Sequence, residues 1–201
     1  MSKLSFTLLG LTLFGSPAIA SEVRHAGAHV HGVNFVQMVL EGQTLEITYQ
    51  LVAGQLDGAE KYGHHDHDHD HKHDDHKHDD HAEDHAKVER REAAIGQLEN
   101  HEALFHLPSA ANCARTGFEG VLQDVTENHH NHDADKEAHA GHQDAILQYT
   151  FTCQQPNNLN SIEFHAFETY GSQLEKIQIE GLIGSKAISS ELTESAPELT
   201  W

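Results

Sequence analysis

The chain has 201 residues, of which 32 are acidic, 12 are lysine or arginine and 21 are histidine. Its formal net charge of −20, counted with neutral histidine, argues against nucleic acid as a partner, because phosphate binding requires a basic surface. A negative surface instead concentrates divalent metal ions. Without the histidine-rich stretches, the remaining length suits one compact domain.

The first 20 residues have the pattern of a secretory signal peptide. Lys3 precedes an apolar run over residues 4–14, and Ala18 and Ala20 give the small-residue pattern of a cleavage site. A membrane anchor is the alternative, but the run is too short to span a bilayer and is interrupted by serine and threonine. We therefore expect cleavage after Ala20 and export of a single domain, residues 21–201, with no membrane span.

Three histidines follow near the predicted new N-terminus, His25, His29 and His31. In an extended strand His29 and His31 point to the same side, because the side-chain period is two. The sequence predicts a preformed metal site here. The alternative is a frayed terminus with incidental histidines.

Residues 33–40 and 44–51 predict a β-hairpin that turns at Glu41 and Gly42. The second run alternates between apolar and polar residues, which is typical of a strand with one buried face. The residues expected to face the core are Leu45, Ile47, Tyr49 and Leu51.

Residues 64–85 hold ten histidines, eight aspartates and one glutamate, with no apolar residue larger than alanine. Such a segment buries too little apolar surface to offset the entropy of ordering it. Imidazole is the commonest protein ligand for zinc-like ions, and carboxylates can complete the coordination sphere. The composition favours several weak, exchanging metal sites over a merely solvated linker.

Apolar residues spaced near the helical period then predict an amphipathic helix over residues 83–105, ending before Pro108. Two pairs of potential ligands lie four residues apart in this part of the chain, His81 with His85 and Glu102 with His106. Either pair is placed to share an ion on one helix face, and the alternative for each is simple solvation or capping.

Two further strands are predicted at residues 113–121 and 146–153, on either side of a second histidine-rich stretch at 129–142. Each strand carries one of the two cysteines, Cys113 and Cys153. In an exported protein this pairing predicts a disulfide, with a thiolate metal site as the alternative.

The C-terminal part predicts another hairpin, from residues 162–169 and 174–183, and then a tail with short alternation. Trp201 is expected to dock on the core. His165 stands alone in its predicted strand, where a histidine is more often a core or surface residue than a ligand.

These elements predict an α+β fold: a mainly antiparallel sheet of about six or seven strands, one packed helix and two disordered His-rich loops. A β-sandwich is the alternative.

The expected metal is Zn²⁺, bound as several ions, and Ni²⁺ or Cu²⁺ would bind the same imidazoles. The sequence has no H-E-x-x-H motif and no convincing catalytic triad, so we do not expect an enzyme. The candidate metal ligands are His25, His29, His31, His64, His65, His67, His69, His71, His73, His76, His78, His81, His85, His129, His130, His132, His139 and His142.

An ordered set of motifs resembles the ZrgA-type periplasmic zinc-uptake proteins of Gram-negative bacteria. The set comprises residues 29–33 (HVHGV) with the hairpin after them, residues 104–108 (LFHLP), the Cys113 and Cys153 strands around a His-rich insert, and the final residues 199–201 (LTW). The long tract at 64–85 and the sequence of residues 52–60 depart from the family pattern.

The resemblance implies a periplasmic protein that captures Zn²⁺ and assists its delivery to a zinc ABC importer. The expected partners are divalent metal ions and a periplasmic zinc-receptor protein or importer component. Buffering or sequestration of zinc, nickel or copper in the periplasm is the alternative function.

Overall fold

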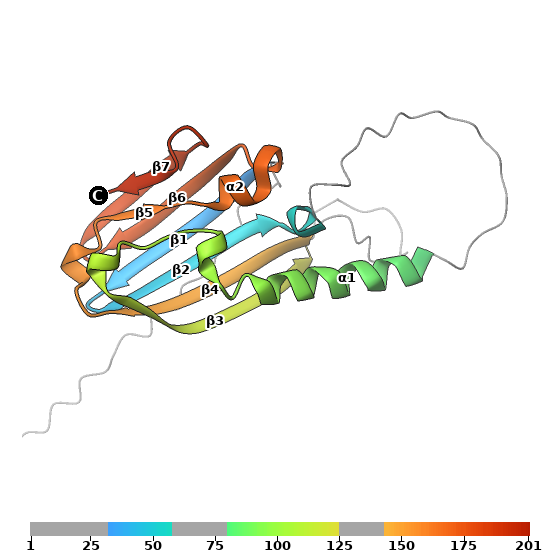
Figure 1. Cartoon of the computed structure of the whole chain (residues 1–201), viewed down its shortest axis with the longest axis horizontal. Coiled ribbons are helices and arrows are strands. Elements are labelled where there is room, and N and C mark those ends of the chain that lie inside the picture. The colour runs from blue at the N-terminus through green and yellow to red at the C-terminus, as the bar shows by residue number, and fades with distance from the viewer. Residues whose placement is uncertain (1–31, 58–79, 125–142) are drawn as a thin grey trace, which may run out of the picture.

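The structure is a computed structural model that describes residues 32–57, 80–124 and 143–201, with side chains from residue 85 onward in the second range (Figure 1). Its main element is a six-stranded sheet with strand order β3-β4-β2-β1-β6-β7. The bounds are β1 Val33–Glu41, β2 Thr44–Val52, β3 Cys113–Asp124, β4 Gln143–Cys153, β6 Lys176–Ile183 and β7 Lys186–Leu192.

A second, two-stranded sheet and two helices accompany this sheet. Figure 1 shows α1, α2 and the segment that joins α1 to β3 on one face of the large sheet. The apolar residues of that face and of these segments form one core cluster, so the fold is α+β, as predicted. The bounds are β5 Ser161–Glu163, β8 Glu198–Thr200, α1 Asp80–Gln97 and α2 Ala166–Tyr170.

The predicted N-terminal hairpin is confirmed. β1 and β2 pair antiparallel, from Phe35 opposite Gln50 to Glu41 opposite Thr44. The four residues of β2 that were expected to face the core are at most 1% exposed. The alternation of the sequence was therefore sufficient to fix the face of this strand that is buried.

The predicted C-terminal hairpin is wrong. β5 ends at Glu163 and pairs with β8, and β6 joins β1 in a parallel pair, which makes the main sheet mixed. Beyond Phe164 the segment forms helix α2, whose buried residues are Ala166, Phe167 and Tyr170, and the buried aromatic residues Phe164, Phe167 and Tyr170 are spaced three apart. The spacing of the apolar residues changes from two to three at this point. The strand predicted over residues 162–169 is therefore too long at its C-terminal end.

The predicted helix is longer than the observed one at its C-terminal end. α1 ends at Gln97, and a separate 3₁₀ turn, His101–Ala103, follows it. The side chain of Asn100 accepts a hydrogen bond from the amide of Glu102 and so begins the new turn. At the other end, α1 starts at Asp80, so the last residues of the tract, expected in a disordered loop through His85, are helical.

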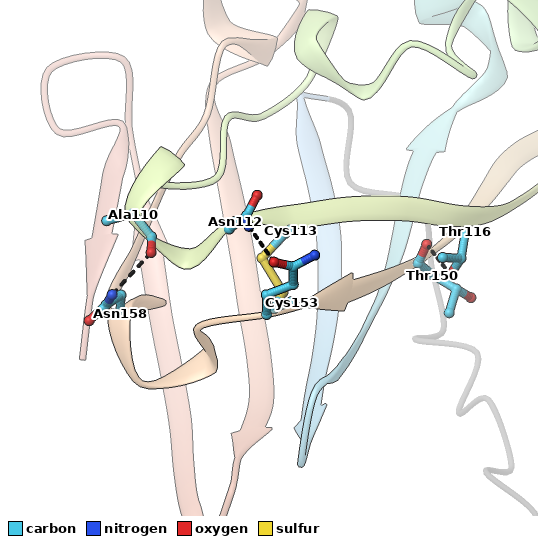
Figure 2. The surroundings of a disulfide bond; sticks show 8 residues. Ala110, Asn112, Cys113, Thr116, Thr150, Cys153 and Asn158 are labelled. Atoms are coloured by element: carbon cyan, nitrogen blue, oxygen red, sulfur yellow. Dashed lines mark hydrogen bonds between the residues drawn. A yellow bond between two sulfur atoms is a disulfide. The ribbon is translucent and has the colours of Figure 1, made fainter.

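The predicted disulfide is present between Cys113 and Cys153. Figure 2 shows it joining the neighbouring ends of β3 and β4, close to the hydrogen bond between Asn158 and the carbonyl of Ala110. The disulfide lies at one end of the β3–β4 hairpin, and the pair Asp124 and Gln143 lies at the other end. Trp201 is partly buried against the core, as expected for a docked terminus.

Candidate functional site

The described residues that precede or follow the histidine-rich stretches in the sequence lie at one end of the main sheet. β1 begins at Val33, and its antiparallel register with β2 sets this residue beside the end of β2. At the same end, Val52 of β2 pairs with Asp144 of β4, and Asp124 of β3 pairs with Gln143 of β4. The described residues that border residues 25–31, 64–79 and 129–142 in the sequence therefore meet at one end of the sheet, which we call the open end.

A buried arginine ties these segments together. Arg91 of α1 is 3% exposed and donates two hydrogen bonds to Asp57, from Nε to Oδ1 at 2.9 Å and from Nη2 to Oδ2 at 2.7 Å. Its Nη1 donates to Oε1 of Gln143 at 3.1 Å, and Gln143 donates to Oδ1 of Asp124 at 2.8 Å. The last described residues before both gaps in the chain thus belong to one network, which we call the Arg91 network.

The electrostatics of this network favour an ionised Asp57. Partial burial by itself raises the pKa of Asp57, but the hydrogen bonds and charge of Arg91, with a smaller contribution from Lys87, outweigh this effect and hold the pKa below its ordinary value. Bidentate arginine–carboxylate pairs are among the stronger and more directional polar contacts in proteins. The network therefore holds α1 to the 3₁₀ turn Ala53–Asp57, which follows β2, and to the β3–β4 hairpin.

A second group of polar side chains lies between the 3₁₀ turn and the segment that leads into α2. We call it the His–Glu cluster, and its members are Glu102, His106, Glu163 and His165. Nδ1 of His106 lies 3.0 Å from Oε2 of Glu102, and Nε2 of His165 lies 4.0 Å from Oε2 of Glu163. The two imidazole rings are nearly parallel, with centroids 6.1 Å apart.

His101 lies beside this cluster but packs inward. Its ring contacts Phe105 and Phe151, with centroid distances of 5.2 and 4.8 Å. Burial lowers the pKa of His101 more than the neighbouring Glu102 raises it, so its imidazole is neutral at neutral pH. We therefore regard His101 as part of the aromatic core.

The eighteen histidines predicted as metal ligands lie outside the residues whose side chains are described, with one exception. His85 is an exposed residue of α1. The backbone of His81 belongs to the first turn of α1, and its side chain lies outside the description. Among the described side chains, no group of three or more histidine, cysteine, aspartate or glutamate residues is arranged to hold a metal ion.

Of the two predicted pairs, Glu102 and His106 are in contact, on the 3₁₀ turn and the residues after it. We did not predict that Glu163 and His165 would lie beside this pair. The usable signal was the alternation of residues 162–165, in which Ile162 and Phe164 are buried while the two polar residues face outward. The burial of Arg91 on α1 was not predicted from the sequence.

Within the described segments, neither helix is long and apolar enough to cross a membrane. A comparison with known protein families gives a match over residues 83–201 to the ZrgA family zinc uptake protein. No curated protein matches the chain. The matched region covers more than half of the sequence and includes α1, both cysteine strands and the C-terminal strands. The chain belongs to the ZrgA family of zinc uptake proteins.

Proposed function

We propose that this protein captures Zn²⁺ in the periplasm and assists its delivery to a zinc ABC importer. Membership of a zinc uptake family supports the metal and the direction of transport. The structural observation that carries the proposal is the open end, where the strand register gathers the described neighbours of three histidine-rich stretches. Ligands attached at a common place have a high effective concentration for one another.

The proposed ligands are the eighteen histidines named above, from residues 25–31, 64–85 and 129–142. The net charge of −20 raises the local concentration of divalent ions and speeds their encounter with these stretches. Many closely spaced imidazoles and carboxylates offer an ion several equivalent coordination spheres. Exchange among them allows release to a receptor, which a single closed four-ligand site would hinder.

The proposal also includes export, with cleavage after Ala20. The disulfide between Cys113 and Cys153 supports an oxidising compartment such as the periplasm. Mass spectrometry of protein purified from the periplasmic fraction tests this directly, with an expected N-terminus at Ser21. Recovery of the chain in the cytoplasm with residues 1–20 still attached would contradict it.

Zinc calorimetry on the mature protein tests metal capture. Because α1 begins at Asp80, the tract variant should change residues 64–79 alone and leave the helix intact. Replacing the eight histidines of this segment by asparagine should lower the number of bound ions. A matched variant, with its six aspartates replaced by asparagine, keeps the imidazoles and should retain more ions than the histidine variant.

A third variant, with His25, His29 and His31 replaced by alanine, tests the predicted preformed site. We expect it to remove the tightest binding event and to leave the weaker events in place. Loading of all the forms should decrease below about pH 6, because protons compete with metal for imidazole. Equal stoichiometry at pH 5 and at neutral pH would contradict histidine ligation.

Sequestration of excess zinc, nickel or copper is the competing function, because Cu²⁺ binds imidazole sites more tightly than Zn²⁺ does. A strain without the protein separates the two functions. Uptake predicts poor growth when zinc is chelated, and sequestration predicts sensitivity to added metal. We assign no catalytic step to the protein under either function.

A further inference from the structure

We propose that His106, His165 and Glu163 form a surface zinc site, with Glu102 as the residue that positions His106. The ligands would be Nε2 of each imidazole and a carboxylate oxygen of Glu163, with water in the fourth position. This inference rests on the proposed function, since it takes zinc as the ion that the protein carries. It adds a site on the rigid domain to those expected in the histidine-rich stretches.

The backbone holds the three ligands on one side. His106 and Glu163 lie opposite each other in an antiparallel bridge, with hydrogen bonds of 2.8 and 3.1 Å in the two directions. Residues paired in this way point to the same face, and His165, two residues after Glu163, shares that face. The amide of His165 donates to the carbonyl of Leu104 at 2.9 Å, which fixes the third position.

The opposite face of the same segments is buried in the core. Phe105 and Phe164, which alternate with the three ligands, are at most 2% exposed, and their ring centroids lie 6.3 Å apart. The hydroxyl of Thr169 adds a hydrogen bond of 2.6 Å to the carbonyl of Ala103. Apolar packing and main-chain bonds therefore position the ligand-bearing residues before any ion arrives, which lowers the entropic cost of binding.

Both imidazoles have their Nε2 atoms available as ligands. Nδ1 of His165 lies 3.0 Å from the carbonyl oxygen of Glu102, and a carbonyl only accepts, so this nitrogen carries the proton of the neutral ring. Nδ1 of His106 donates in the same way to the carboxylate of Glu102. The lone pairs of both neutral rings therefore lie on Nε2. A histidine whose other nitrogen donates to a carbonyl or carboxylate is the usual arrangement at zinc sites.

The side chains must rearrange to close around an ion. Ligand atoms bound to zinc at about 2.0–2.1 Å lie about 3.3 Å apart in a tetrahedron, whereas Nε2 of His165 is 4.0 Å from the carboxylate of Glu163. The parallel rings, 6.1 Å apart, must also tilt toward each other. His106 and Glu163 are 45% and 55% exposed, so both can rotate without displacing the core.

Carbethoxylation of histidine by diethyl pyrocarbonate, read residue by residue by mass spectrometry, tests the site in the full mature chain with Zn²⁺ as the probe. The reagent attacks an imidazole nitrogen with a free lone pair, so bound zinc protects that residue. We expect the reaction rates of His106 and His165 to decrease together, with one shared zinc midpoint. Glu163→Gln should shift this midpoint to higher zinc, while Glu168→Gln, an exposed change on α2, should leave it unchanged.

Glu102→Ala should raise the midpoint by about tenfold, the loss typical of a partner that orients a ligand. Glu102→Gln keeps an acceptor oxygen and should restore most of the affinity, which a purely structural defect would not do.

Unchanged rates at His106 and His165, with zinc binding still recorded by calorimetry, would overturn this site and leave the proposed function standing. No zinc binding to the chain at all would overturn both. An unshifted midpoint in Glu163→Gln would remove the carboxylate from the ligand set and overturn the three-ligand site.

Discussion

The two ends of the β3–β4 hairpin are built in different ways. At one end Cys113 and Cys153 join the strands covalently, and hydrogen bonds from Asn112 and Asn158 support the turns around them (Figure 2). At the open end the strands are held by Arg91, through Gln143 to Asp124. The first end is held by a covalent bond, while the second depends on hydrogen bonds between charged and polar side chains.

The difference suggests a division of labour. A covalent bond at the far end keeps the hairpin paired whatever is bound elsewhere. At the open end, the Arg91 network joins described residues that border the histidine-rich stretches in sequence, so it offers a rigid base for the metal binding proposed for those stretches. The four predictions that follow test what holds the fold together, and the first also tests whether stability and zinc binding are separable.

Breaking the disulfide should have the largest effect on stability. The bond spans a sequence separation of 40 residues, for which chain entropy gives a contribution on the order of 3–4 kcal/mol. Changing both cysteines to alanine should lower the free energy of unfolding by about this amount in urea titrations. The number of zinc ions bound at neutral pH, below the unfolding transition, should not change. A parallel loss of zinc stoichiometry would show that the two ends are coupled.

Replacing Arg91 should have the next largest effect, because it leaves Asp57 and Gln143 without their shared donor. We expect Arg91→Gln to lower the free energy of unfolding by about 1.5–3 kcal/mol, the range for hydrogen bonds to a charged group. Arg90→Gln removes the same charge from the neighbouring exposed position and should change stability by less than about 0.5 kcal/mol. If both variants lost the same stability, the loss would come from the removed positive charge and not from the hydrogen bonds of Arg91.

Gly120 of β3 should be needed for α1 to pack at its observed position. A Cβ at this position would collide with the side chain of Ile95 on α1. Gly120→Ala should destabilise the fold by about 1–2 kcal/mol, as overpacking does. Gly117→Ala is the matched change on the same strand, where a Cβ would meet Thr150 at an ordinary 3.4 Å. If the two variants unfold at the same urea concentration, α1 does not depend on this close approach.

The sequence predicted the parts of this fold that follow from local pattern. Strict alternation located β2 and its buried face, and the two cysteines in predicted strands located the disulfide. The parallel pairing of β1 with β6 was not predictable in this way. It joins residues far apart in sequence, and no local period distinguishes it from a hairpin with the preceding segment.

The site was predictable to a similar degree. Histidine density identified the stretches at 64–85 and 129–142 by composition alone, and their attachment at one end required the strand register. The burial of Arg91 was not predicted, because helical periodicity identifies only the apolar face of a helix. It does not reveal that an arginine of that helix binds Asp57. His165 was set aside as a lone histidine, because its neighbours Glu102 and His106 are about 60 residues away and only tertiary structure brings them close.

The pH dependence of stability gives the smallest and most selective test of the open end. Since Arg91 holds the pKa of Asp57 below its unfolded value, the ionised form stabilises the fold, fully so above the unfolded pKa of about 3.9. This contribution is lost as the pH decreases through the folded pKa. The stability difference between the native chain and Asp57→Asn should therefore be present at pH 7 and diminish below pH 4 in urea titrations. A stability difference that stays constant with pH would mean that the charge of Asp57 does not contribute to stability. The Arg91 network would then act through hydrogen bonding and packing alone.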